Sequence, residues 1–258
     1  KMKKYLFFLG GHDAEMDEIK NLLEQEGYIP FDKGLSWDNA LLSSYKENLN
    51  QILDDQIPVF IELKMDCEYP RNARIIDHHG ERAGKDMKTS IEQVADLLCM
   101  QLNRHQQLVS ANDKGHISSM QKLCATDKEI QEIRELDRRA QGVTSADEEK
   151  ARESVEKHLE KIVDDTAIID SLTNKSSAVF DIIYKKYRHI FIYTPDGGMH
   201  YSGTGKMVCN LKNIFNEMQF DNPDIKYWFG GSLPEQGYFG SNHQIEKKKL
   251  KKIKQFLT

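Results

Sequence analysis

The sequence predicts an α/β fold, in which a domain with a mostly parallel sheet is joined by a helical linker to a smaller α/β domain. In the first half of the chain, short apolar runs alternate with amphipathic helical stretches. These runs are apolar throughout rather than at every second position, which is typical of parallel strands covered on both faces. A highly charged helical stretch then precedes a second set of short strands. We therefore expect a domain at residues 1–145, a linker at 146–175 and a smaller domain at 176–258.

The elements of the first domain follow from two periodicities. Continuous apolar runs such as "YLFFL" and "PVFI" predict strands, and apolar residues three or four positions apart predict helices. One of these helices has a strong start signal, because Thr89 or Ser90 can cap it. The expected strands are residues 3–10, 57–63, 73–79 and 106–113. The expected helices are residues 14–27, 43–56 and 89–103.

The second half of the chain begins with charged helices. Residues 125–142 and 144–172 have helical periodicity, and the second of these stretches should form the linker. Residues 189–203 predict a β-hairpin, because "PDGG" supplies its turn. A helix is expected at residues 206–218, and a strand followed by a glycine-rich loop at 225–241.

Composition argues against several classes of protein. The net charge of −5 argues against a generally basic surface for nucleic acid, and no apolar run approaches the roughly 20 residues of a membrane span. The mean hydropathy of −0.64 indicates a water-facing chain. The four cysteines are widely spaced, which argues against a zinc ribbon and fits reduced thiols. We expect a cytoplasmic protein with no membrane partner, and the sequence is compatible with a homodimer.

Candidate metal ligands stand at the end of each expected strand. Ligand sites in parallel α/β sheets form beyond the carboxyl ends of the strands, so these side chains should meet. The candidates are His12, Asp13 and Glu15 after the first strand, Glu62 in the second, Asp77, His78 and His79 ending the third, and Asp113 ending the fourth. Asp66 follows the second strand and is an alternative to Glu62.

The chemistry of these residues points to a metal site. Each of them alone would suit a turn, a helix cap or a strand edge, but carboxylates in apolar strands are costly unless they are paired or metal-bound. Carboxylate oxygens combined with imidazole nitrogens suit Mn²⁺, Fe²⁺, Co²⁺ or Zn²⁺, with Mg²⁺ as a further alternative. The ligands exceed the need of one ion. We therefore expect two Mn²⁺ ions, in the kind of centre that activates water for attack on phosphorus.

The order of the motifs resembles that of the DHH phosphoesterase superfamily, which includes RecJ-type exonucleases, small-oligonucleotide ribonucleases, cyclic-dinucleotide phosphodiesterases and manganese-dependent pyrophosphatases. "IIDHHGER" is similar to the motif that names the family, and "FLGGHDAE", "VFIEL" and "VSAND" stand at the places of three other motifs. The resemblance covers roughly residues 5–115, and the rest of the chain is similar only in plan. It implies that His79 and Asp77 act in catalysis, with His78 and Asp113 in the same site. We add Arg82 to the catalytic residues because it stands beside this motif.

The first two motifs depart from the family pattern. The family places aspartates four and six residues after its first histidine, where this chain has Met16 and Glu18. Its acidic residues are instead Asp13 and Glu15, and Glu62 stands where the family has an aspartate. An alternative hypothesis is therefore a binding or scaffold protein that keeps the fold without catalysis.

The expected substrate carries phosphate. Arg82 and Lys114 flank the acidic motifs and can offset phosphate charge. Glycines in "FGGSLPEQGYFG" can bring backbone N–H groups close to a phosphate or a base, and we assign substrate contacts to Gly230, Gly231 and Gly237. Neighbouring aromatic residues favour a nucleotide phosphodiester or a short oligonucleotide as substrate. A pyrophosphatase-like hydrolase of phosphoanhydrides is the alternative enzyme.

Overall fold

The computed structural model describes residues 5–163 and 165–253 of the chain. The chain divides into two compact units. The first unit runs to His78 and resumes over Met87–Gln141, and the second unit comprises His79–Asp86 and the chain from Gly142 onward. The stretch that the sequence assigned to a linker therefore lies within the second unit.

The first unit is built on a parallel sheet with the strand order β1-β2-β3. Its strands are β1 (Tyr5–Leu9), β2 (Ile57–Ile61) and β3 (Arg74–Ile76). This confirms the predicted α/β class with a parallel sheet, although residues 3 and 4 of the expected first strand lie outside the described residues. Leu9 pairs with Ile61, and Ile61 with Ile76, so the three strands end level with one another. The residues that follow them emerge at one edge of the sheet.

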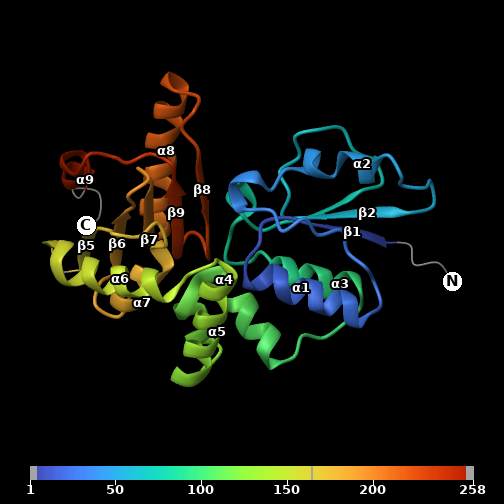
Figure 1. Cartoon of the computed structure of the whole chain (residues 1–258), viewed down its shortest axis with the longest axis horizontal. Coiled ribbons are helices and arrows are strands. Elements are labelled where there is room, and N and C mark those ends of the chain that lie inside the picture. The colour runs from blue at the N-terminus through green and yellow to red at the C-terminus, as the bar shows by residue number, and fades with distance from the viewer. Residues whose placement is uncertain (1–4, 164, 254–258) are drawn as a thin grey trace. The chain divides into compact units, whose positions relative to one another are not determined.

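Both faces of this sheet are covered, which explains its continuous apolar runs. Helices α1 (Ala14–Gln25) and α3 (Ser90–Leu97) lie on one face of the sheet (Figure 1). Their apolar residues pack against strand residues such as Phe7. Phe8 points to the other face, which is covered by the segment that holds the short helices. These are η1 (Trp37–Asn39), η2 (Leu42–Tyr45) and α2 (Lys46–Leu49). The helix predicted at residues 43–56 is thus wrong beyond its first turns.

The predicted fourth strand is also wrong, because residues 106–113 lie in helix α4 (Arg104–Lys122). Asn103 starts this helix by a capping box: its side chain accepts from the N–H of Gln106, whose side chain accepts from the N–H of Asn103. Six of these eight residues are buried, and the buried ones include the polar residues Gln106, Ser110 and Asn112. Helix α5 (Asp127–Ala140) follows where a helix was predicted.

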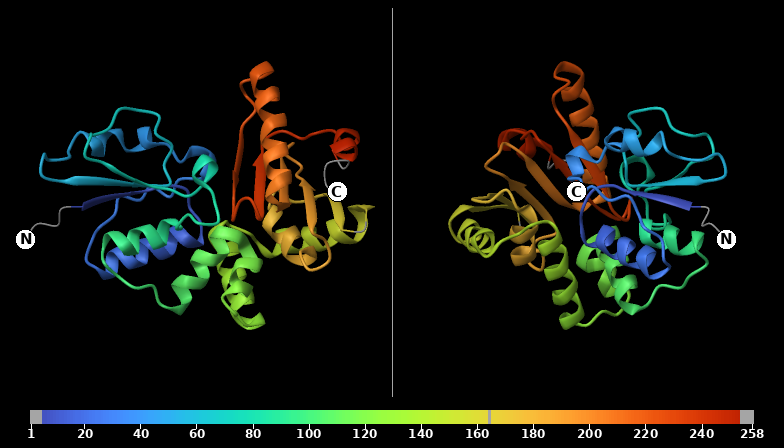
Figure 2. Two further views of the ribbon diagram at one scale, coloured as in Figure 1. Left: turned by 180° about the vertical axis from the view of Figure 1, so that it is seen from behind. Right: turned by 45° about the vertical axis from the view of Figure 1, so that its right-hand side comes forward.

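The second unit contains a six-stranded mixed sheet with the order β4-β5-β6-β7-β9-β8. Helices α6 (Ser145–His158) and α7 (Ser176–Ile183) cover one face, and α8 (Gly205–Asp221) covers the other (Figure 2). The predicted hairpin is confirmed as β6 (His189–Tyr193) and β7 (Met199–Thr204), which pair antiparallel. The helix predicted at 206–218 corresponds to α8. The described part of the chain ends in α9 (Lys247–Ile253).

Two predicted elements of this unit need correction. The long linker helix ends at His158, and the chain continues as β4 (Leu159–Val163) and β5 (Thr166–Asp170). The β-branched residues of "TAIID" favour a strand, and they are buried beside β6. The glycine-rich loop is short, because β8 (Tyr227–Gly230) is followed by β9 (Gln236–Ser241).

Among the described residues, no helix has both the length and the apolar character needed to cross a membrane.

Candidate metal centre

Glu62 follows β2 and is held in an unusual backbone conformation. Its φ angle is 52°, in the left-handed region that costs a non-glycine residue roughly 1–2 kcal/mol. Its N–H donates to the carbonyl of Ile76 at 2.8 Å, and the residue is only 4% exposed. The end of β1 passes so close that a Cβ on Gly10 would lie 2.1 Å from the carbonyl oxygen of Glu62. Glycine at position 10 therefore allows the two strand ends to meet.

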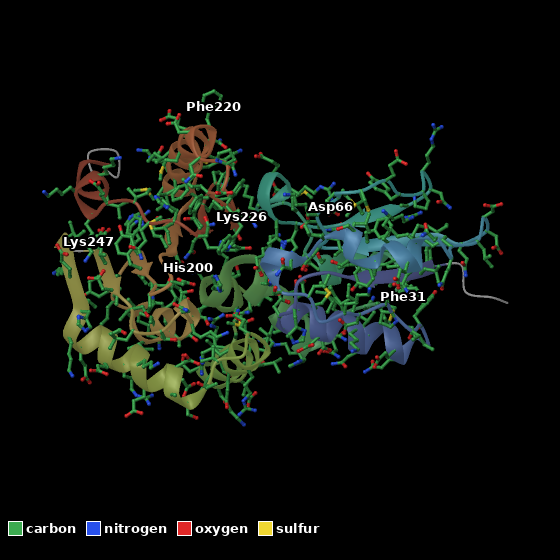
Figure 3. All side chains as sticks on the ribbon, turned by 45° about the horizontal axis from the view of Figure 1, so that its top comes forward. Phe31, Asp66, His200, Phe220, Lys226 and Lys247 are labelled. Atoms are coloured by element: carbon green, nitrogen blue, oxygen red, sulfur yellow. The ribbon has the colours of Figure 1, made fainter. Side chains whose placement is uncertain are left out.

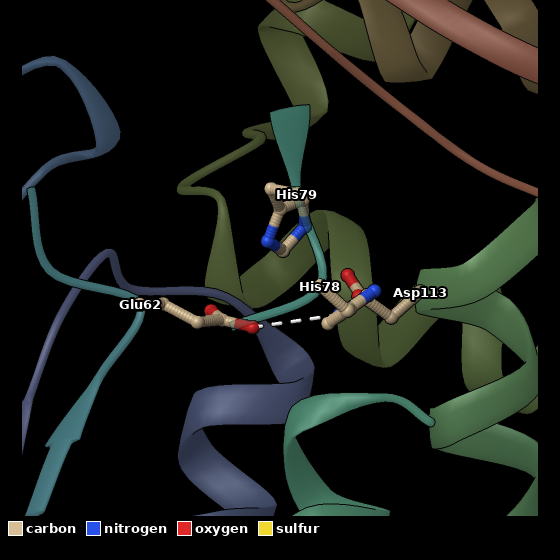
Figure 4. A group of neighbouring side chains, drawn as sticks. All are labelled: Glu62, His78, His79 and Asp113. Carbon is tan, nitrogen blue, oxygen red and sulfur yellow. Dashed lines mark ion pairs between the residues drawn. The ribbon is translucent and has the colours of Figure 1, made fainter. Parts of the chain in front are cut away.

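His78 is the centre of a buried group of acids. Its ring nitrogen Nε2 lies 2.7 Å from Asp113 Oδ2, and the residue is 5% exposed. The same nitrogen lies 3.3 Å from Glu15 Oε2 and 3.5 Å from Glu62 Oε1, the contact drawn as a dashed line in Figure 4. One imidazole nitrogen carries at most one proton. Three carboxylates that converge on it form a concentration of negative charge around a single point.

Four side chains are close enough to hold one metal ion. Glu62, His78, His79 and Asp113 each offer a ligand atom, and these atoms all lie within 4.8 Å of one another (Figure 4). Two imidazoles and two carboxylates form a donor set that suits Mn²⁺, Co²⁺ or Zn²⁺. The set combines residues after β2 and β3 with one from α4.

Two further buried acidic residues, Asp13 and Glu15, lie beside this group. Asp13 caps α1 by accepting from the N–H of Met16 at 2.9 Å, and Glu15 accepts from the N–H of Ile91 at 3.1 Å. Burial raises the pKa of Glu15 to about 8, and repulsion from Asp113 adds to the rise. Burial and repulsion from Asp113 likewise raise the pKa of Asp13 well above its ordinary value.

The pKa of the His78 imidazole is raised, as expected for an imidazole beside carboxylates. Burial alone would lower its pKa, but the charge and hydrogen bond of Asp113, together with hydrogen bonds to Glu15 and Glu62, raise it well above the ordinary value. Asp13, Glu15 and His78 thus hold protons more tightly than free side chains do, because burial penalises the charged form of the two carboxyl groups and the neighbouring acids add negative charge. A divalent cation would offset this charge, so the residues present fit a metal ion.

Other predicted ligands lie outside the group of four. His12 is directed to Asp17, with 3.5 Å between Nδ1 and Oδ1, and its side chain is 41% exposed. Asp77 is partly buried after β3, and its carbonyl accepts from the side chain of Gln93. Asp66, the alternative to Glu62, lies on the exposed loop after β2, where it accepts from the N–H and hydroxyl of Ser43 (Figure 3).

The two basic side chains that were predicted to bind substrate phosphate lie in different surroundings. Arg82 is exposed in the short helix η3 (Gly80–Arg82). Lys114 lies in α4, and its Nζ donates to the carbonyl of Met87 at 2.5 Å. The structure therefore places Lys114 against backbone and Arg82 in contact with solvent.

The packing of the structure itself requires glycine at the three positions that were predicted to contact substrate. A Cβ on Gly230 would lie 2.3 Å from the hydroxyl of Tyr238, and one on Gly231 would lie 2.6 Å from the Cα of Gly237. Gly231 also has a φ angle of 112°, which side chains rarely allow. Close packing of β8 on β9 thus accounts for these glycines.

Sequence reasoning missed one buried cation near the centre, Arg134 of α5. It is 3% exposed and donates to Asp137 Oδ2 at 2.8 Å. The sequence does contain a signal for it. Arg134 and Asp137 share the helical spacing of Ile130 and Ile133, so a charged pair stands on the apolar face of the helix.

Comparison with known proteins found similarity in structure alone. No protein-family model matches the chain, and no curated protein matches its sequence. The chain is similar to a pGpG-specific phosphodiesterase from Vibrio cholerae, with a TM-score of 0.42 and 11% identity, over 100% of this chain and 97% of that chain. It is also similar to the DHH domain of a member of a family of ribosomal proteins, with a TM-score of 0.49 and 12% identity, over 96% of this chain and 84% of that chain. At these identities neither similarity assigns a role to a residue of this chain.

Proposed function

We propose that this chain is a DHH-type, metal-dependent phosphohydrolase that cleaves short oligonucleotides or nucleotide phosphodiesters. The observation that carries the proposal is the convergence of Asp113, Glu15 and Glu62 on one ring nitrogen of His78. Buried carboxylates destabilise a fold unless a cation compensates them. A protein that gathers them at the edge of a parallel sheet, where ligand sites form, has a functional reason to do so.

The roles follow from the position of each group. Glu62, His78 and Asp113 would hold one divalent ion, and Asp13 and Glu15 would contribute carboxylates to a second. When bound, two Mn²⁺ ions, or Co²⁺ or Mg²⁺ in their place, activate water and offset phosphate charge. In this proposal His79 polarises the phosphorus centre or protonates the leaving oxygen, because its ring belongs to the same group. The cation of Arg82 binds a substrate phosphate.

The second unit offers a surface that suits a nucleobase. Trp228 on β8 is 46% exposed, and it stands opposite Gly240 of β9. A Cβ on Gly240 would lie 2.3 Å from the indole ring, so the tryptophan lies flat over the glycine. His200 stands opposite the same glycine on β7, with its ring 5.8 Å from the indole. Exposed aromatic rings on a sheet stack bases, which favours a nucleotide over pyrophosphate as substrate.

The proposal is tested by a metal and substrate screen. The protein is stripped with chelator and assayed with dinucleotides, cyclic dinucleotides, oligonucleotides and pyrophosphate, with Mn²⁺, Co²⁺ or Mg²⁺ added. We expect no turnover in chelator and the best recovery with Mn²⁺ or Co²⁺ on a nucleotide substrate. Turnover of pyrophosphate alone would support the phosphoanhydride hydrolase instead. Absence of both turnover and metal binding would support the scaffold protein.

A matched pair of variants locates the activity. Glu62→Gln removes one carboxylate of the group of four, and Asp66→Asn removes an exposed carboxylate on the loop that follows the same strand. We expect Glu62→Gln to lower turnover by about 100-fold or more, a loss typical of charge-stabilising groups. Asp66→Asn should stay close to the wild type. Equal losses in both variants would mean that the assayed site lies elsewhere.

A further inference from the structure

Helix α4 folds back on itself immediately after the candidate metal ligand Asp113. Gly115 and His116 leave the helical conformation, and His116 has a φ angle of 51°. Arg104, the first residue of the helix, donates to the carbonyl of Leu123 at 3.0 Å, just beyond its last residue. A straight helix of this length would span roughly 28 Å, so the two halves must lie side by side. Asp113 therefore lies at the bend of α4 and not in the middle of a straight helix.

Arg134 of α5 fills the inside of this bend. Its Nη1 donates to the side-chain oxygen of Asn112 at 2.9 Å, before the break in the helix. The same nitrogen lies 3.4 Å from the ring nitrogen Nδ1 of His116, after the break. Asp137 pairs with the guanidinium from α5 itself. One buried cation thus contacts both sides of the bend, and its charge is balanced by a buried carboxylate.

The contacts of Arg134 are linked to the candidate metal centre by the backbone of α4. Asn112 directly precedes Asp113, whose carboxylate is the nearest of the three to the ring nitrogen of His78. A shift of Asn112 relative to His116 would change the direction in which Asp113 points. Arg134 opposes such a shift, because its contacts require both residues to stay in place.

We infer that Arg134 is a positioning residue of the metal centre, which orients Asp113 toward His78 by holding the bend of α4. The inference rests on the proposed function, because it takes the group around His78 to be a metal site. The competing role is stability alone, in which the Arg134–Asp137 pair merely packs α5 against α4. A variant that folds normally should bind metal more weakly if Arg134 positions Asp113. It should bind metal as the wild type does if Arg134 contributes only to stability.

The charge pair can be removed without leaving a buried charge. Replacing one partner would strand the other in the interior, whereas replacing both with apolar residues of similar size is often neutral or stabilising. The double variant Arg134→Met/Asp137→Leu therefore leaves no buried charge, and it removes the hydrogen bond that the buried amide oxygen of Asn112 accepts. Arg134→Lys is the complementary variant, because it keeps the charge but lacks the planar fork that holds a fixed geometry.

The test measures Mn²⁺ binding by titration with electron paramagnetic resonance, together with thermal unfolding in chelator, and needs no substrate. We expect both variants to melt close to the wild type in chelator and to bind Mn²⁺ at least ten-fold more weakly. Arg139→Met removes an exposed cation that pairs with Glu135 on the same helix, and it should leave both measurements unchanged.

Each other outcome overturns the inference. If the wild type binds Mn²⁺ and both variants bind it equally well, Arg134 does not position Asp113, while the proposed function stands. If both variants melt far below the wild type, Arg134 is a stability residue. If the wild type binds no Mn²⁺, the proposed function fails, and the inference fails with it.

Discussion

Glu62 holds a left-handed backbone conformation and a buried carboxylate at the same position. Both features cost free energy, and neither serves the packing of the sheet, because glycine would relieve the backbone and an apolar side chain would suit the interior. Strain of this kind gathers at functional sites, where the surrounding structure keeps it in place. These two features make Glu62 a candidate ligand of the proposed metal site.

His200 provides a pH-dependent prediction in the second unit. Burial lowers its pKa to about 4, although the charge of Asp196 opposes the shift. Between pH 6.5 and 4 the unfolded chain therefore binds a proton at this position that the folded chain does not. The stability that depends on neutral His200 is complete above pH 6.5 and is lost as the pH falls toward 4. The loss should reach about 1–3 kcal/mol.

The measurement is chemical denaturation between about pH 7 and pH 4, the range over which this linkage acts. His200→Gln cannot titrate, so the variant should lose less stability than the wild type across this range. His243→Gln serves as the control, because it removes an exposed histidine of the same unit. A wild type and a His200→Gln variant with parallel pH profiles would show that His200 is protonated as readily in the fold as outside it.

At the scale of elements, the close approach of the ends of β1 and β2 sets where the candidate ligand Glu62 lies. Gly10→Ala would place a methyl group 2.1 Å from the backbone carbonyl of Glu62, so one strand end must move. Gly11→Ala would instead meet the ring of Trp37 at 2.6 Å, and that ring is 43% exposed and can turn away. We expect Gly10→Ala to cost about 2 kcal/mol or more and Gly11→Ala less than about 1 kcal/mol.

The two glycine variants also separate stability from ligand geometry. Thermal unfolding in chelator gives the first quantity, and Mn²⁺ titration of the folded protein gives the second. Gly10→Ala should weaken Mn²⁺ binding even where it is fully folded, because Glu62 is displaced. Similar Mn²⁺ affinity in the two variants would show that the close approach of the strands does not set the position of Glu62.

At the scale of the whole molecule, each unit has a hydrophobic core of its own. The core of the first unit includes Phe7 and Val94, and that of the second includes Phe191 and Phe215. The acids around His78 belong to the first unit. A metal ion held by them should therefore stabilise the first unit more than the second, because a ligand stabilises what it binds when folded.

The two tryptophans allow this to be measured, since Trp37 lies in the first unit and Trp228 in the second. Trp228→Phe leaves a reporter in the first unit, and Trp37→Phe leaves one in the second. With Mn²⁺ at about 100 times its Kd, the Trp37 signal should report about 2.7 kcal/mol of added stability, and the Trp228 signal little change. Identical shifts in both variants would show that the units unfold as one.

The sequence by itself determined the α/β class and the three strands of the first sheet. Continuous apolar runs report burial on both sides, and a short run with β-branched or aromatic residues forms a strand between two layers. The level ends of β1, β2 and β3 then follow from parallel pairing. Glu62 and His78 therefore come to the same edge of the sheet by local rules that can be read along the chain.

Only the tertiary structure decided how the remaining residues are placed. Residues 106–113 form a helix although the sequence predicts a strand, and packing buries polar residues of this helix such as Gln106, Ser110 and Asn112. Asp113 reaches the centre from the bend of that helix rather than from the end of a strand. His12 is directed to Asp17, and Arg134 is buried beside Asn112. Such contacts depend on how whole elements pack and on where a helix bends, which no local pattern records.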